Sequence, residues 1–315
     1  MIKRQLGTSD ITIGPMIFGC WQAAWPGVNE DDIIAANVAA FDAGIIAFDT
    51  AEGYGNGHSE RILAKSFEGK RDGIVIATKV SAHNLKADKV IEACEGSLKN
   101  LNTDRIDLYQ IHWPSGSWGS PIVPISETLE ALLKLKEQGK IRAIGVSNFN
   151  AAQLAEAAAY TSIDTIQPPY SLLWRSGELE TFPLARKHHL SIIAYSPLAQ
   201  GLLTGKFGPD TTLDKSDVRF SNRLFQPENF GRVQAALNVL RVIAERNNTS
   251  LGNLALSWLL YQPDVFPIVG ARTPEQAKDN VKALEVVLSP FDLAEIDAAG
   301  RTVTDHLDDN PKMWA

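Results

Sequence analysis

Four side chains that can hold or transfer a proton stand at the ends of successive apolar runs or, for Tyr54, five residues beyond one. Asp49 closes one run, and Tyr54 follows it by five residues. Lys79 closes the next run, and His112 directly follows the run after that. A carboxylate at the end of a buried strand is costly unless a cation pairs with it, so Asp49 is expected to meet Lys79. Together these side chains form a constellation suited to proton transfer.

The elements that must position them follow from the alternation of short apolar runs with longer amphipathic ones. The predicted strands are residues 16–18, 45–49, 74–79, 106–111, 141–146, 165–167, 190–194 and 266–269. Helices are predicted between nearly all of them, with caps at Asn29, at Asn150 with Gln153, and at Thr273 with Gln276. Residues 2–13 are predicted to form a small hairpin.

This pattern predicts an α/β fold of the (β/α)8 TIM barrel type, with an N-terminal β-hairpin and extra C-terminal helices, in one domain over residues 1–315. A doubly wound sheet is the alternative. It is disfavoured because the first strand-to-helix turn, Gly19-Cys20-Trp21, lacks the G-x-G-x-x-G of a dinucleotide-binding open sheet. In a barrel the active face lies at the carboxyl ends of the strands, where the four side chains would meet.

Composition restricts the classes of partner. The net charge of -7, the pI near 5.4 and the lack of a basic run argue against nucleic acid and against an anionic membrane. Cys20 and Cys94 are too few for a disulfide framework. The N-terminus has no signal-like apolar segment, and no run approaches 18 apolar residues, so a cytoplasmic location is expected.

At this point the chain resembles the aldo-keto reductase family over nearly its whole length. The matching stretches are G-T-S-D at 7–10, D-T-A-E-G-Y-G at 49–55, H-S-E at 58–60, A-T-K at 77–79, L-K-N-L-N-T-D-R-I-D-L-Y-Q-I-H-W-P at 98–114, G-K-I-R-A-I-G-V-S-N-F at 139–149, Y-S-P-L-A-Q-G-L-L-T-G-K at 195–206 and G-A-R-T-P-E-Q at 270–276. The resemblance implies an enzyme that passes hydride from NADPH to an aldehyde or ketone, with the cofactor lying across the barrel mouth.

The resemblance also implies a role for each member of the constellation. Tyr54 is expected to be the general acid, with its pKa lowered by a Lys79 ammonium that Asp49 holds in place. His112 is expected to hydrogen-bond the carbonyl oxygen of a small-molecule substrate. The expected substrate-binding residues are Trp21, Tyr54, His112 and Trp113. Trp25, Trp118 and Trp174 would add to an aromatic-walled pocket.

For the cofactor, NADPH or NADP+, the family pattern places Ser147, Asn148 and Gln167 at the nicotinamide carboxamide and Tyr195 on the ring. The loop from Ser196 to Gly201 would receive the pyrophosphate, with Lys206 and Arg219 adding charge. Arg272 would grip the 2'-phosphate at a helix start. The full set of expected cofactor residues is Cys20, Trp21, Asp49, Ser147, Asn148, Gln167, Tyr195, Ser196, Pro197, Leu198, Gln200, Gly201, Lys206, Arg219, Gly270, Ala271, Arg272, Gln276 and Asn280. No metal is expected.

Two functions of other classes stay open. A cofactor-binding barrel like the channel-associated relatives of this family would keep the cofactor residues and turn over little. A Schiff-base aldolase would use Lys79 as its nucleophile. The sequence also leaves open the substrate, the direction of reaction, the oligomeric state, and whether the tail 301–315 closes the pocket.

Overall fold

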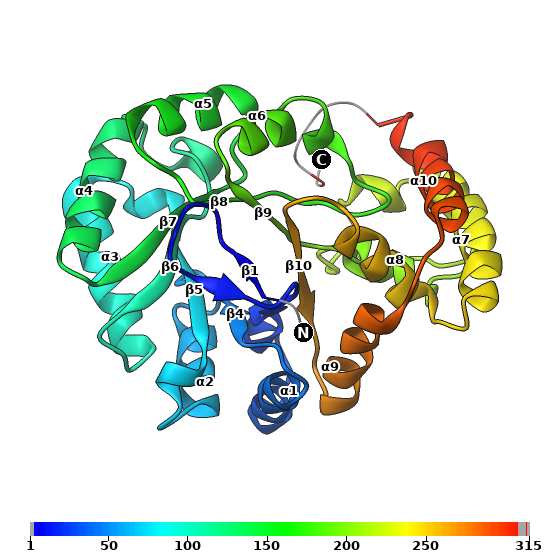
Figure 1. Ribbon diagram of the computed structural model, residues 1–315, viewed down its shortest axis with the longest axis horizontal. Helices are drawn as coiled ribbons and strands as arrows, with labels where there is room; N and C mark the ends of the chain where they lie inside the picture. The colour runs from blue at the N-terminus through cyan, green and yellow to red at the C-terminus, as the bar shows by residue number, and fades with distance from the viewer. Residues whose placement is uncertain (1–2, 308–312, 314–315) are drawn as a thin grey trace.

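A computed structural model describes residues 3–307 and residue 313. In these residues eight parallel strands close into a barrel, so the predicted fold is confirmed (Figure 1). The barrel strands are β3 (Ile17–Gly19), β4 (Ala47–Asp49), β5 (Val75–Val80), β6 (Ile106–Ile111), β7 (Ile141–Ser147), β8 (Thr165–Gln167), β9 (Ser191–Ala194) and β10 (Val265–Gly270). Each strand pairs with the next one in sequence, and β10 pairs with β3 to close the ring.

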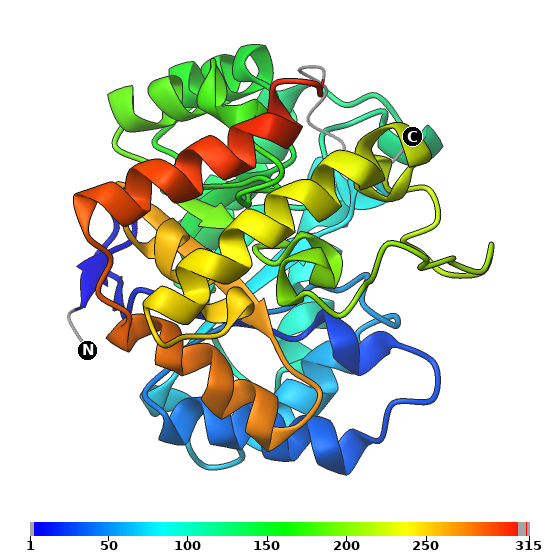
Figure 2. The same ribbon diagram turned by 90° about the vertical axis from the view of Figure 1, so that its right-hand side faces the viewer.

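Helices surround the barrel in chain order (Figure 1). They are α1 (Glu30–Asp42), α2 (His58–Ser66), α3 (Ala87–Asn100), α4 (Ile125–Glu137), α5 (Ala151–Tyr160), α6 (Thr181–Lys187), α7 (Pro227–Arg246), α8 (Leu251–Leu260), α9 (Pro274–Val281) and α10 (Pro290–Thr304). The extra helix α10 packs against α7, which lies in the long connection between β9 and β10 (Figure 2). No helix among the described residues has the length and apolar character needed to cross a membrane.

The predicted hairpin, β1 (Arg4–Gln5) with β2 (Thr12–Ile13), covers one end of the barrel. Its apolar side chains, such as Leu6 and Ile11, are buried together with residues of the barrel strands. Gly7 has a φ of 55°, and a side chain there would meet the Asp164 carbonyl oxygen at 2.1 Å. The hairpin can therefore lie this close to the barrel only with glycine at that turn. Figure 2 shows it at the end opposite the connection after β9.

Most predicted helix caps are found. Asn29 accepts a hydrogen bond from the Asp31 N–H, and Asn150 forms a complete capping box with Gln153. The capping box predicted at Thr273 is wrong. The Thr273 hydroxyl does accept from the Gln276 N–H, at 3.4 Å, but the Gln276 side chain accepts from the Arg272 N–H one residue earlier.

The tail 301–315 falls into two parts. Residues 301–304 form the last turn of α10. Residues 308–312, Trp314 and Ala315 lie outside the described residues, so closure of the pocket by the tail stays an open question of the sequence.

Candidate active site

The four side chains of the constellation come together at the carboxyl end of the barrel. Asp49 is the last residue of β4, Lys79 is next to last in β5, and His112 directly follows β6. Strand pairing puts Gly19 beside Asp49 and Lys79 beside Gln110. Tyr54 reaches the same place from the loop after β4, where its ring lies edge-on to the His112 ring with 5.6 Å between centroids.

Asp49 and Lys79 form a buried ion pair. Lys79 is fully buried, and its ammonium nitrogen lies 2.5 Å from Asp49 Oδ1 and 2.8 Å from the Thr50 carbonyl oxygen. Burial by itself lowers the pKa of Lys79, but the attraction of Asp49 and the contact with Tyr54 outweigh it, so this pKa is raised. Lys79 therefore stays protonated at physiological pH and places its ammonium near Tyr54, whose ring centroid is 5.2 Å from Lys79 Nζ.

The expected decrease in the pKa of Tyr54 is wrong. Burial of the phenol raises this pKa more than the Lys79 ammonium lowers it, and Asp49 adds a smaller increase. The contribution of Lys79 has the expected direction, but desolvation is larger. Tyr54 is consequently a neutral phenol at physiological pH, which is the form that can donate a proton.

The His112 imidazole is held in its neutral form. Burial, with a smaller contribution from the Lys79 charge, lowers its pKa to about 3. A neutral imidazole has one N–H donor and one acceptor nitrogen. His112 can therefore donate a hydrogen bond to an oxygen in the site without bringing a second positive charge beside Lys79.

We expect the His112 ring to stay neutral from pH 8 down to about pH 5, because its pKa lies well below the ordinary value of about 6.5. Nitrogen-15 chemical shifts of the imidazole, recorded against pH, check this. The exposed His83 serves as an internal reference. A His112 midpoint near 6.5 would contradict the expectation.

Two buried amides that hold Asp49 connect the ion pair to the barrel interior. Gln167 Nε2 donates to Asp49 Oδ2 at 2.9 Å, and Gln110 Nε2 donates to the same oxygen at 3.4 Å. Gln110 was missed by sequence reasoning. The available signal was an amide near the end of β6, a fully buried strand whose other charged or amide residue is Asp107. A side chain at Gly145 would collide with Thr165 and Gln110, so the glycine makes room for this network.

Three other predicted residues form a second network beside His112. Asn148 donates from its amide nitrogen to the His112 carbonyl oxygen at 2.9 Å and to Ser147 Oγ at 3.0 Å. Its amide oxygen accepts from the Tyr195 hydroxyl at 2.8 Å. Ser147 Oγ in turn donates to the Gln167 carbonyl oxygen at 2.7 Å. These groups are braced at the ends of β7, β8 and β9, where the resemblance places the nicotinamide carboxamide.

The loop after β9 has the backbone of a strained binding loop. Ser196, Ala199 and Gln200 all have positive φ without being glycine. Gln200 Oε1 accepts from Asn222 Nδ2 at 2.9 Å, but Gln200 Nε2 is a buried donor with no partner among the described residues. Pro197 and Leu198 lie within this loop. A buried donor without an acceptor in the loop expected to receive the pyrophosphate fits a ligand rich in acceptor oxygens.

Cationic side chains gather beyond this loop. The pKa of Lys206 is lowered by partial burial and by the neighbouring charges of Arg219 and Arg272. Arg219 is paired with Asp217, with 2.8 Å between Arg219 Nε and the carboxylate, so its charge is largely compensated. Arg272 is exposed and forms no ion pair within the described ranges, and its guanidinium carbon lies 6.0 Å from the Trp25 ring centroid. Lys206 and Arg272 are thus the charges available to an anion.

The segment from β10 to α9 is braced by two predicted residues. Gln276 Oε1 accepts from the Arg272 N–H at 2.9 Å, and Asn280 Nδ2 donates to the Gly270 carbonyl oxygen at 3.2 Å. Ala271 between them is buried. A side chain at Gly270 would overlap the amide of Gln22, which sequence reasoning also missed. Gln276 and Asn280, both expected to bind the cofactor, therefore fix the backbone that presents Arg272.

The aromatic residues divide into wall and core. Trp21 packs edge-on against Trp25 at 5.2 Å between centroids, and Trp113 packs edge-on against Trp118 at 5.3 Å. Trp21 is 37% exposed, whereas Trp174 is only 1% exposed within the core. The expected place of Trp174 in the pocket wall is therefore wrong.

Cys20 is buried beside the site. Its N–H donates to the Asp49 carbonyl oxygen, and burial raises the pKa of its thiol.

Comparison with known proteins finds one matching family model and three similar proteins. The model of the Aldo/keto reductase family matches residues 15–301. An NADH-specific methylglyoxal reductase from Escherichia coli is 36% identical over 93% of this chain and 96% of its own length. The structure of a glycerol dehydrogenase from Gluconobacter oxydans has a TM-score of 0.88 and 32% identity, covering 99% of each chain. An aldo-keto reductase from Klebsiella pneumoniae in complex with NADPH has a TM-score of 0.79 and 27% identity, over 100% of this chain and 99% of that one.

Proposed function

The chain belongs to the aldo/keto reductase family of oxidoreductases, and from that premise we propose that it reduces aldehydes or ketones with NADPH, with Tyr54 as general acid. The observation that carries the proposal is the Tyr54 phenol placed over the buried ion pair of Lys79 and Asp49. Reduction of a carbonyl needs a hydride at carbon and a proton at oxygen.

NADPH, when bound, supplies the hydride. Tyr54 holds the proton and gives it to the carbonyl oxygen as negative charge develops there. The phenolate that remains is stabilised by the Lys79 ammonium, which Asp49 and the Thr50 carbonyl oxygen keep in place. Neutral His112 donates a hydrogen bond to the same oxygen and so orients the substrate.

Residues around Tyr54, Lys79 and Asp49 fit the cofactor. Ser147, Asn148 and Tyr195 would hold the nicotinamide, and Gln200 offers an unused buried donor toward the pyrophosphate. Lys206 and Arg272 supply uncompensated positive charge for a 2'-phosphate, which supports NADPH over NADH. One relative is named NADH-specific and a structural neighbour was solved with NADPH, so the preference of this chain depends on its own residues.

The Schiff-base alternative loses support from the site itself. An amine must be unprotonated to attack a carbonyl carbon. The Asp49 partner raises the pKa of Lys79, which keeps the nitrogen charged and its lone pair occupied by a proton. The substrate we propose is a small carbonyl compound between the Trp21–Trp25 pair and the Trp113–Trp118 pair.

A turnover assay tests this function. The purified protein with NADPH and a panel of short aldehydes, including methylglyoxal and glyceraldehyde, should show substrate-dependent loss of absorbance at 340 nm. NADH at the same concentration should give a lower kcat/KM. Tight cofactor binding without turnover on any aldehyde or ketone would instead favour the non-catalytic binding barrel.

Replacing Gln110 by leucine should lower kcat about threefold to tenfold, because one weak hydrogen bond to a charged group, of about 1 kcal/mol, is lost from Asp49. Cofactor affinity should stay unchanged, since Gln110 is fully buried beside Lys79 and is not one of the residues proposed to hold the cofactor. Steady-state kinetics and a fluorescence titration separate the two quantities. A fall in melting temperature with unchanged kcat would show that Gln110 is only a packing residue.

A further inference from the structure

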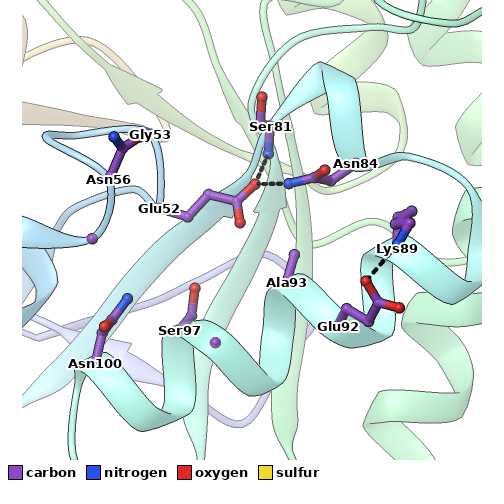
Figure 3. Close-up of a pocket in the computed structure, with 12 residues that line it drawn as sticks. Glu52, Gly53, Asn56, Ser81, Asn84, Lys89, Glu92, Ala93, Ser97 and Asn100 are labelled. Carbon is purple, nitrogen blue, oxygen red and sulfur yellow. Dashed lines mark hydrogen bonds and ion pairs between the residues drawn. The ribbon is translucent and has the colours of Figure 1, made fainter.

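A cavity of about 460 Å³ lies behind the loop that carries Tyr54. We call it the α3 cavity, and Figure 3 shows the residues around it. One wall is the face of α3 that includes Gly96 and Ser97. The others are the outer side of the loop after β4, with Glu52 and Gly53, and the turn after β5, with Asn84. None of the four residues of the constellation lines it.

The cavity is kept open by glycines that the backbone does not require. Gly96 lies in the interior of α3, where glycine weakens a helix relative to alanine. A side chain at Gly96 or at Gly53 would meet nothing within 4 Å, and neither residue has a positive φ. Neither close packing nor turn geometry therefore accounts for these two residues, and both leave the space beside them empty.

Glu52 places an uncompensated carboxylate in the cavity. Its Oε1 accepts from the Ser81 N–H at 2.6 Å and from Asn84 Nδ2 at 2.9 Å, both neutral donors (Figure 3). In the described part of the chain no cation pairs with Glu52, which is half-buried, and burial raises its pKa. A desolvated carboxylate is stabilised most by a cation.

The other charges around the cavity are already compensated. At one end Lys89 pairs with Glu92 at 2.7 Å. At the other end Asn100 lies between opposite charges, accepting from Arg61 at 3.1 Å and donating to Glu60 at 3.0 Å. The carboxylate of Glu52 is thus the charge around the cavity that no described residue compensates.

Ser97 adds a second unused polar group. It is 1% exposed, and Figure 3 shows its hydroxyl directed into the cavity. The Tyr109 hydroxyl lies beside it, and a hydrogen bond with Ser97 lowers the otherwise raised pKa of that tyrosine. Two hydroxyls that bond to each other still leave one O–H without an acceptor, and no other group among the described residues supplies one. Buried hydroxyls are rarely left this way, so a further hydrogen-bonding group is missing from the cavity.

We propose that the α3 cavity is a second binding site, for a small amine that also carries a hydroxyl group, with the ammonium held by Glu52 and the hydroxyl by Ser97. Bound there, the ligand fixes the loop after β4. Glu52 stands two residues before Tyr54, its N–H donates to the Lys79 carbonyl oxygen at 3.3 Å, and its own carbonyl oxygen accepts from the Gly57 N–H at 2.7 Å. The proposal does not depend on the proposed function.

Calorimetric titration with 3-amino-1-propanol, in an amine-free buffer and without cofactor or carbonyl compound, tests it. The wild type should bind with a millimolar dissociation constant, and the neutral 1,3-propanediol should not bind. Glu52→Gln should weaken binding at least about tenfold, as loss of a charge-assisted contact does. Glu137→Gln, an exposed carboxylate at the end of α4, is the matched control and should bind as wild type.

Two further measurements keep the result unambiguous. Gly96→Leu should fill the cavity and abolish binding while turnover stays as in the wild type, because its side chain enters free space. Hydrogen exchange in residues 50–57 should slow when the amine binds. No heat with the wild type, equal affinity for the diol, or undiminished binding by Gly96→Leu would each overturn the proposal, whether or not the protein reduces aldehydes.

Discussion

Replacing Tyr54 by phenylalanine should lower kcat for aldehyde reduction by at least about 100-fold, the size expected when a positioned general acid is removed. The ring and its edge contact with His112 remain, so the loss should come from the proton alone. The dissociation constant for NADPH should stay within about twofold, because the hydroxyl is proposed to act on the substrate oxygen. Steady-state and single-turnover kinetics measure the first effect, and a fluorescence titration measures the second.

Two other tyrosines supply matched controls for this substitution. Tyr160→Phe removes an exposed hydroxyl that donates to Glu130 on the outside of the barrel, and it should leave all constants unchanged. Tyr195→Phe removes the hydroxyl that holds Asn148, and it should weaken cofactor binding more than it lowers kcat. Turnover by Tyr54→Phe at the wild-type rate would remove Tyr54 from the mechanism.

Replacing Arg272 by alanine should raise the NADPH dissociation constant by about 10- to 100-fold and leave that for NADH within about threefold. A guanidinium at a helix start gives a 2'-phosphate charge-assisted hydrogen bonds of about 1.5–3 kcal/mol, and about 1.4 kcal/mol corresponds to a factor of ten. NADH has a hydroxyl at that position and gains no such contact. The salt dependence of NADPH binding should also become weaker, since the lost contribution is electrostatic. Isothermal titration calorimetry at two salt concentrations measures all three quantities.

Lys278→Ala is the control for Arg272, because it removes the same charge from an exposed position on α9, the helix that follows Arg272. It should reduce NADPH affinity by less than about twofold, as expected of a screened surface charge. Equal weakening of both cofactors by Arg272→Ala would make Arg272 a brace of the loop or a pyrophosphate contact. In that case the preference for NADPH would have no support from this residue.

Much of the candidate site could be predicted because polar residues follow apolar runs. The carboxyl ends of parallel strands meet at one edge, so Asp49, Lys79 and His112 had to be neighbours once the barrel was inferred. Side chains inside the runs gave weaker signals. Gln110 looked like part of a buried strand, and only the closed barrel turns its amide toward Asp49, whose strand is not adjacent to β6.

By itself the sequence determined the order of strands and helices, the family, and which side chains stand at the barrel mouth, because these depend on periodicity and on local motifs. Only the tertiary structure decided how deeply these side chains are buried and which groups shift their pKa values. The pKa of Tyr54 rises rather than falls because desolvation sums over every segment packed around the phenol. Trp174 belongs to the core, and Glu52 faces a cavity where no cation of the described residues pairs with it. Burial and hydrogen-bond partners depend on distances between segments far apart in the chain, which no local pattern specifies.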